Sequence, residues 1–306
     1  MGFEPRRTPS ILGFPHRPEW GPVAHRRAVA GYLRNCREHA RISPRHVADC
    51  IGVSESTVSR METGQSVLRP LDVERLMRAC GVTDQAEYER AARLTDEAGR
   101  AEPWQQHGQV VPRWVRPLLG MELAAQRILS YEPQLVPGWL QTPEYAEIVI
   151  RSVHPTASRQ EIDTRVQVRV ERLEMFRRRL DPPVLLAVMD EGVFTRQVGS
   201  PGTMRRQVRH LLNLLEELPY QLRLQIASQS VGAAGVVVGH PVVHLRFHAA
   251  DHLPDMVYLE QFEGATYYEK PADTERYQAV MNNLCGLASP YERTRTLLAE
   301  AAAHVW

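Results

Sequence analysis

Residues 32–82 decide the fold of the first part of the chain, and they read YLRNCREHARISPRHVADCIGVSESTVSRMETGQSVLRPLDVERLMRACGV. Ser43 and Pro44 are typical of a helix start, with a hydroxyl N-cap before a proline at the first helical position. Val47 follows as a small apolar contact. Gly52 lies in a turn that needs a left-handed backbone. The pattern predicts two short helices joined by a tight turn.

The second of these helices begins after Ser54, which is expected to cap it. Val58 and Met61 lie three positions apart, so they share one face and point into the bundle. The other face carries polar side chains, namely Glu55, Ser56, Thr57, Ser59 and Arg60. A short helix with such a face is what the major groove of DNA accepts.

Several small motifs around this turn share the order and spacing of one family. They are Leu33-Arg34, Arg37-Glu38, Ala48, Gly52-Val53-Ser54, Val58-Ser59 and Met61-Glu62-Thr63-Gly64. In this arrangement the stretch resembles the XRE family of helix-turn-helix transcriptional regulators, whose domains are similar to lambdoid phage repressors. The resemblance implies an all-α, lambda-repressor-like bundle that binds double-stranded DNA.

The resemblance also implies a role for individual positions. The expected DNA-binding residues are Ser54, Glu55, Ser56, Thr57, Arg60 and Thr63, of which Glu55, Ser56 and Arg60 fall where base edges are read. Thr57 and Thr63 fall where hydroxyls or backbone amides meet phosphates. Chemistry agrees, because arginine grips guanine through two hydrogen bonds and hydroxyls suit phosphate oxygens.

Arg37 and Glu62 fall where the family often places an ion pair that ties the first helix to the end of the recognition helix. Two positions depart from the family pattern. Arg41 stands where a glycine usually ends the first helix, and Pro44 replaces a glutamine that contacts DNA. We therefore expect the fold to be kept better than the DNA contacts.

The length and the charge of the chain limit the functions that it can have. At 306 residues the chain is long enough for two domains, and its net charge is only +1. Up to Arg69, however, eleven arginines face six acidic residues, so positive charge gathers where DNA is expected. Lys270 is the only lysine, which suggests a GC-rich genome and an actinobacterial source. Without an apolar signal segment or membrane-length run, we expect a soluble, cytoplasmic protein with no membrane role.

The expected organisation has four parts. Residues 1–22 form a proline-rich arm, and residues 23–99 form the helix-turn-helix domain, which ends in a connecting helix. Residues 100–110 are polar and are expected to be a linker. Residues 111–306 form a mixed α/β domain that receives a signal or a partner.

The second domain contains a specific stretch, EPQLVPG at residues 132–138, and later DPPVLLAVMDEGVFTRQVGSPGTMRRQVRHLLNL and MVYLEQFEGATYYEKP. These resemble the domain of unknown function that follows an XRE-type helix-turn-helix in many actinobacterial regulators. The resemblance implies transcriptional control and a small acidic partner protein.

Apolar patterning in this region predicts strands at 184–189, 222–227, 242–247 and 256–260. Helices are expected at 204–218, 271–287 and 291–302, together with a long amphipathic helix around 162–176. A strand-helix-strand order predicts that the first two strands are parallel. The arginine-rich face of the long helix (Arg165, Arg169, Arg172, Arg177, Arg178 and Arg179) is expected to be solvated.

Candidate binding chemistry lies on two strands. His244, Arg246 and His248 alternate with apolar residues, so they share one face of a strand. Asp190 and Glu191 follow another strand, where α/β proteins often keep binding groups, but capping of the next helix is the favoured explanation for this pair. These five residues form the candidate ligand face. Asp251 and His252 follow His248, and three histidines with an aspartate could bind zinc. An exposed polar face is favoured over zinc binding, and no metal or cofactor is predicted.

Two functions remain open. The first is a sequence-specific DNA-binding regulator that acts as a homodimer, because one such helix reads few base pairs, and that responds to a small-molecule effector or a partner. The second is an enzyme built on the regulator scaffold, acting on a small molecule or an aminoacyl-tRNA, with tRNA as its partner.

Overall fold

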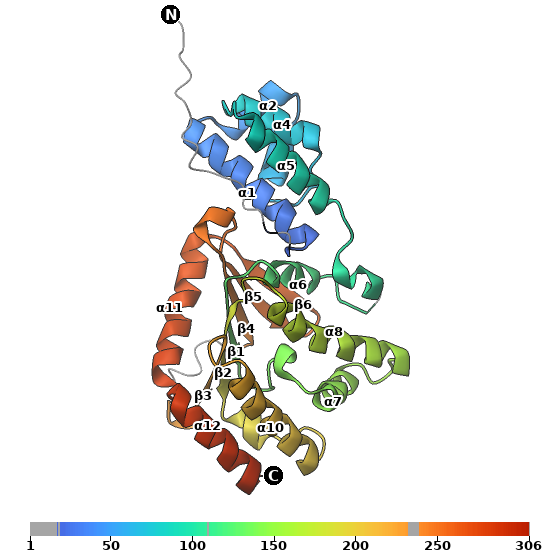
Figure 1. Ribbon diagram of the computed structural model, residues 1–306, viewed down its shortest axis with the longest axis vertical. Coiled ribbons are helices and arrows are strands. Elements are labelled where there is room, and N and C mark those ends of the chain that lie inside the picture. Colours follow the sequence, from blue (N-terminus) through green and yellow to red (C-terminus); the bar gives the residue numbers. More distant parts are fainter. Residues whose placement is uncertain (1–16, 18, 109, 232–238, 306) are drawn as a thin grey trace, which may run out of the picture. The chain divides into compact units, whose positions relative to one another are not determined.

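The computed structural model describes residues 17, 19–108, 110–231 and 239–305 (Figure 1). Most of the proline-rich arm expected at 1–22 lies outside these residues. The described chain divides into two compact units. The first holds the described residues up to Gln105 together with Leu119–Ala124 and Phe247–Pro254, and the second holds the remainder. No helix among the described residues is long and apolar enough to cross a membrane.

The first unit is built on five helices, which confirms the all-α prediction: α1 (Pro22–Ala40), α2 (Pro44–Ile51), α3 (Glu55–Glu62), α4 (Pro70–Ala79) and α5 (Gln85–Ala98). Their apolar faces meet in one core, which includes Leu33, Val47, Val58 and Leu76. Three of these helices begin with proline, which suits the first turn because its missing N–H needs no partner there.

The segment expected as a linker has structure of its own. It contains the 3-10 helix Pro103–His107, in which Trp104 is only 5% exposed. Just before it, the carboxylate of Glu102 accepts a hydrogen bond of 2.5 Å from the backbone N–H of Val23, at the start of α1. Residues 102–105 therefore pack as part of the first unit, and the division between the two units falls between Gln105 and Gln106, inside the predicted segment.

The second unit is a mixed α/β domain, as predicted, around a six-stranded sheet. The strands, in the spatial order β3-β2-β1-β4-β5-β6, have the following bounds: β3 (Leu222–Ala227), β2 (Val184–Asp190), β1 (Arg127–Glu132), β4 (Val242–Arg246), β5 (Met256–Gln261) and β6 (Gly264–Tyr268). The strands β1, β2 and β3 are parallel, and β4, β5 and β6 continue antiparallel from β1. The expected parallel pair is β2 and β3. The sequence patterns missed β1 and β6.

Helices cover both faces of this sheet (Figure 1). The connections from β1 to β2 and from β2 to β3 carry α7 (Pro143–Val153), α8 (Arg159–Arg177) and α10 (Pro201–Glu217). Right-handed crossovers in one direction place such helices on the same face. The opposite face packs against α11 (Pro271–Leu287), and α12 (Tyr291–Glu300) lies beside β3 and α10. Short helices of the second unit include the 3-10 helix Gly138–Leu140, α9 (Gly192–Thr195) and the π-helix Ala301–Val305, whereas α6 (Arg116–Glu122) begins in the second unit and ends in the first.

Candidate nucleic-acid interface

The turn between α2 and α3 has the geometry of a helix-turn-helix. Ser43 caps α2 by accepting a hydrogen bond from the backbone N–H of His46 (3.2 Å), and Pro44 is its first residue. Gly52 ends α2 with φ of 73°, a left-handed conformation that costs glycine little. Ser54 then caps α3 by accepting from the N–H of Thr57 (3.2 Å). The two helices are therefore fixed by local caps on both sides of the turn.

One side of α3 is anchored and the other is open. Val58, Met61 and Glu62 are buried at 0%, 4% and 8% exposure. The residues expected to contact DNA lie on the open side: Ser54, Glu55, Ser56, Arg60 and Thr63 are exposed, and Thr57 is half-buried. Burial of one stripe holds the helix while its polar stripe faces outward, which is what a reading helix requires.

Hydroxyl groups on this open side already bond to one another. The Ser54 hydroxyl lies 2.9 Å from that of Ser56 and 2.8 Å from that of Thr57, and an Arg60 Nη donates to Thr57 Oγ1 at 3.3 Å. Thr63 donates its hydroxyl to the Ser59 carbonyl at 2.9 Å, so only its oxygen lone pairs remain for a ligand. Because these hydrogen bonds are exposed, water or a phosphate oxygen can readily replace either partner. The bond to Thr57 also holds the Arg60 side chain along the helix.

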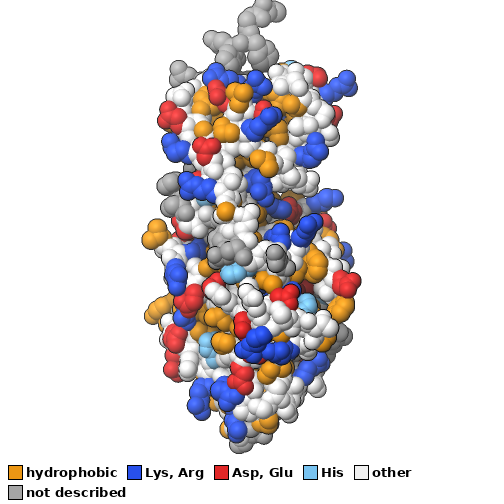
Figure 2. Space-filling model, turned by 90° about the vertical axis from the view of Figure 1, so that its right-hand side faces the viewer, with side chains coloured by type: hydrophobic (Ala, Val, Ile, Leu, Met, Phe, Trp, Pro, Cys, Tyr) orange, Lys and Arg blue, Asp and Glu red, His pale blue; other side chains and the backbone are white. Residues whose placement is uncertain are grey.

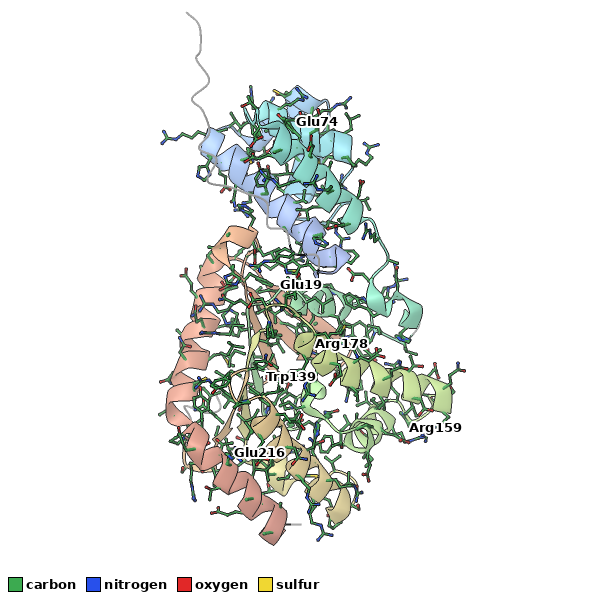
Figure 3. All side chains as sticks on the ribbon, viewed as in Figure 1. Glu19, Glu74, Trp139, Arg159, Arg178 and Glu216 are labelled. Carbon is green, nitrogen blue, oxygen red and sulfur yellow. The ribbon has the colours of Figure 1, made fainter. Side chains whose placement is uncertain are left out.

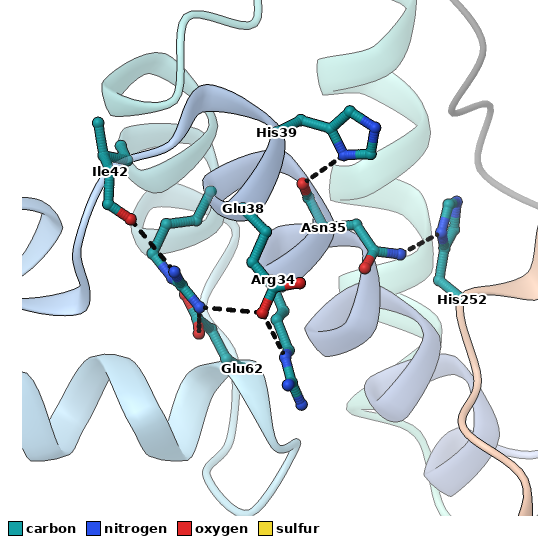
Figure 4. A network of polar contacts seen from close by, with 8 residues as sticks. Arg34, Asn35, Glu38, His39, Ile42, Glu62 and His252 are labelled. Carbon is teal, nitrogen blue, oxygen red and sulfur yellow. Dashed lines mark hydrogen bonds and ion pairs between the residues drawn. The ribbon is translucent and has the colours of Figure 1, made fainter. Parts of the chain in front are cut away.

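Arg37 of α1 and Glu62 of α3, the pair expected from the resemblance, are joined by two hydrogen bonds of 2.6 and 3.0 Å (Figure 4). Their side chains are 12% and 6% exposed. Arg37 also donates to the Ile42 carbonyl, and its hydrogen bond to Glu62 raises the pKa of the guanidinium. The pair therefore ties the end of α3 to α1 in a nearly dry environment.

The structure accounts for one departure from the family pattern. Arg41 follows α1 with φ of 56°, the left-handed conformation for which the family uses glycine. Its backbone N–H donates to the carbonyls of Arg37 and Glu38, so the helix end is satisfied although a side chain is present. The Arg41 side chain is exposed beside α2 and adds a positive charge to this unit.

A segment from far along the chain completes the first unit beside α1. His252 has φ of 56°, and its ring packs edge-on against Tyr32 with centroids 5.4 Å apart. Its Nδ1 lies 2.9 Å from the amide nitrogen of Asn35 (Figure 4). The backbone of Gly31 approaches so closely that a Cβ there would stand 1.8 Å from the His252 carbonyl oxygen. The helix-turn-helix unit thus includes the connection between β4 and β5.

The five residues of the candidate ligand face are not gathered into one site. Asp190 ends β2, and its carboxylate accepts from the N–H of Gly192 at 2.8 Å, which is local capping. Arg246 lies at the opposite end of the sheet, because β4 runs antiparallel to β1 and Arg246 pairs with Arg127. Glu191 opens α9, whereas His248 belongs to the first unit.

His244 corrects the expectation of an exposed polar sheet face. It is 1% exposed and lies between Leu129 and Val257 on neighbouring strands. Burial lowers its pKa, although Asp255, whose Oδ2 lies 3.9 Å from Nε2, opposes the fall. Neither ring nitrogen has a hydrogen-bond partner among the described residues, so His244 is a buried core residue and not part of an exposed face. Across the described parts of the chain, no three His, Cys, Asp or Glu side chains are placed to hold a metal ion.

A charged cluster that the sequence reading missed lies where β1 ends. The pKa of Glu132 is raised to about 8, first by burial and then by the nearby Glu260, while Arg172 and Arg169 oppose the rise. Arg169 donates to the side-chain oxygen of Gln141 at 2.8 Å, and burial lowers its pKa. The sequence did contain a pointer to this cluster, because Glu132 is the first residue of the EPQLVPG stretch at 132–138.

The arginine face of α8 was expected to be solvated, and for part of the helix this was wrong. Arg165, Arg169 and Arg172 are only partly exposed, at positions i, i+4 and i+7 of one stripe. Figure 3 marks the two ends of the helix with Arg159 and Arg178, which are exposed. Helical periodicity predicts that the three arginines share one face of α8. It cannot predict whether another part of the fold covers that face, which is why their exposure was misjudged.

Family comparisons agree with this division of the chain. A family model described as a helix-turn-helix domain matches residues 28–91. Another, described as a domain of unknown function (DUF5753), matches residues 115–300. No curated protein and no solved structure matches the chain. Because the second match spans more than half of the chain, the protein belongs to the DUF5753 family and carries a helix-turn-helix domain ahead of its family domain.

Proposed function

We propose that the protein is a sequence-specific regulator of transcription that docks α3 in the major groove of double-stranded DNA. Glu55, Ser56 and Arg60 then face base edges, with Ser54 at the start of the helix. Thr57 and Thr63 face the phosphates. The assignment rests on the helix-turn-helix family match and on the general readout of the major groove.

The observation that carries the proposal is the two-sided character of α3. Its buried stripe and the Arg37–Glu62 pair hold the helix against α1, while every side chain of the reading set except Thr57 is exposed. A plain structural helix of eight residues would need no such row of hydroxyls beside an exposed arginine. An acidic or apolar exposed face on α3 would have been evidence against DNA binding.

The proposal extends to two finer points. A single recognition helix contacts only a few base pairs, so we expect a homodimer that binds two half-sites about one helical turn apart. The sheet domain receives the signal, from a small-molecule effector or a small acidic partner protein. The connection between β4 and β5 supports coupling, because His252 in that connection contacts Tyr32 and Asn35 of α1.

A binding titration tests the proposal directly. The full chain is titrated into a labelled duplex from upstream of its own gene and into a shuffled duplex of the same composition, at two salt concentrations. We expect the upstream duplex to bind at least about a thousandfold more tightly, the lower end for specific complexes. Equal affinity for both duplexes would remove sequence-specific regulation from consideration.

A second candidate function is supported by the cluster around Glu132. A carboxyl group whose pKa is raised to about 8 beside two arginines is a candidate acid or base. It fits the alternative of an enzyme that acts on a small molecule or an aminoacyl-tRNA. RNA that copurifies with the full chain, combined with no preferred duplex in the titration, would favour this candidate. Specific DNA binding without copurifying RNA would favour the regulator and exclude aminoacyl-tRNA as the substrate.

A further inference from the structure

The second unit contains a half-open pocket of about 330 Å³. Its walls come from the segment before α6, the end of α7, the middle of α8 and the turn between β5 and β6, all of which belong to this unit. Figure 2 views the side of the molecule that carries α7 and α8, where hydrophobic and arginine side chains lie next to one another. The lining residues are Val110, Pro112, Trp114, Val153, His154, Arg165, Phe262 and Glu263.

Three large apolar side chains around this pocket are exposed to solvent. Trp114 is 36% exposed, Val153 48% and Phe262 85%. Single exposed apolar residues are common on protein surfaces, but three from separate elements around one hollow indicate a binding surface. The wall that carries Trp114 is fixed, because the Tyr267 hydroxyl donates to the Trp114 carbonyl and Arg116 donates to the Val111 carbonyl at 3.2 Å.

The polar side of the pocket combines one guanidinium, from Arg165, with the carboxylate of Glu263 and the imidazole of His154. Arg169 lies one helical turn beyond Arg165 on α8. Arg169 is already bonded to Gln141, whereas the Nε of Arg165 is buried without an acceptor among the described residues. Burial and the two arginines lower the pKa of His154, although Glu161 opposes them. A buried guanidinium N–H without an acceptor is costly, and an anion would satisfy it.

We propose that this pocket binds a small organic anion whose acidic group pairs with Arg165 and whose apolar body packs against Trp114 and Phe262. The volume lies at the lower end of ligand sites, which favours a compact carboxylate, sulfonate or phosphate ester over a dinucleotide. The inference deepens the proposed signal-receiving role of the second unit. Binding in this pocket nevertheless requires no DNA.

The probe for the experiment is 1-anilinonaphthalene-8-sulfonate, an aromatic anion whose fluorescence rises in apolar sites. It is titrated into the full chain without DNA. We expect one saturable site, with affinity about tenfold weaker in Arg165→Gln and in Phe262→Ala. Arg178→Gln is the matched control, because Arg178 is an exposed arginine at the end of the same helix and does not line the pocket. Near-ultraviolet circular dichroism checks that each variant stays folded.

A neutral analogue, N-phenyl-1-naphthylamine, separates charge from hydrophobicity. We expect it to bind the wild-type chain more weakly and to be insensitive to Arg165→Gln, since it offers no anion to the guanidinium. Absence of a saturable site, or equal affinity of the sulfonate for wild type and both pocket variants, would overturn the inference. If the sulfonate does not bind but the chain still prefers one duplex, only the pocket inference is refuted. If the sulfonate binds as expected but no duplex is preferred, only the DNA-binding proposal is refuted.

Discussion

Replacing Glu62 by alanine should destabilise the helix-turn-helix unit by about 2–4 kcal/mol. Removing one partner of a buried ion pair typically costs about 3–5 kcal/mol, because the other charge is left without compensation. Arg37 and Glu62 are 12% and 6% exposed and share bonds of 2.6 and 3.0 Å, so they approach that limit. The cost is reduced because Arg37 keeps the Ile42 carbonyl at 3.2 Å and Glu38 at 3.5 Å.

Hydrogen exchange of peptides from α1 and α3 in the full chain measures this loss, since it reports the opening free energy of each segment separately. Glu38→Ala is the control, because that side chain is 47% exposed and should contribute no more than about 1 kcal/mol. The double variant Arg37→Met/Glu62→Leu should recover most of the stability by removing both charges. Exchange in Glu62→Ala no faster than in Glu38→Ala would refute the reasoning.

Three further predictions concern other parts of the molecule. Gly31→Ala, usually stabilising inside a helix, should lower the melting midpoint here, because the new Cβ would stand 1.8 Å from the His252 carbonyl oxygen; a raised midpoint would disprove that packing. The pKa of Glu132 is about 8 in the folded state and lower in the unfolded chain, so its contribution to the free energy of unfolding should fall as pH rises from about 4.5 to 8. Glu132→Gln should weaken this dependence in urea titrations and gain about 1–3 kcal/mol over wild type at pH 8, and an unchanged pH dependence would contradict the assignment. Residues 102–107 should resist limited proteolysis because Trp104 is buried. Early cleavage within these residues would instead support a flexible linker at 100–110.

Local chemistry made much of the first unit predictable. The caps at Ser43 and Ser54 and the left-handed turn at Gly52 are single-residue signals whose physics does not depend on the rest of the chain. Arg41 is a position where residue type alone misleads, because the helix end keeps its left-handed conformation without glycine.

The second unit was less predictable for a tertiary reason. The strand β1 is central in the sheet, but it is short, has Arg127 and Glu132 at its ends and buries a serine, so its sequence lacks a continuous apolar run. The burial of Arg169 and His244 depends on what covers them, which periodicity cannot tell. Residues of the missed cluster come from β1, α8 and β5, far apart in the sequence.

Whether α3 reads DNA sequence can be measured by selecting duplexes from a random pool with the wild-type chain, Arg60→Ala and Arg93→Ala. Arg93 is the matched control, an exposed arginine on α5 outside the reading face. We expect wild type and Arg93→Ala to enrich the same motif. Arg60→Ala should lose preference at one or two base pairs and bind the motif about 1–3 kcal/mol more weakly. No enriched motif with the wild-type chain, or an unchanged motif with Arg60→Ala, would contradict the claim that α3 reads DNA.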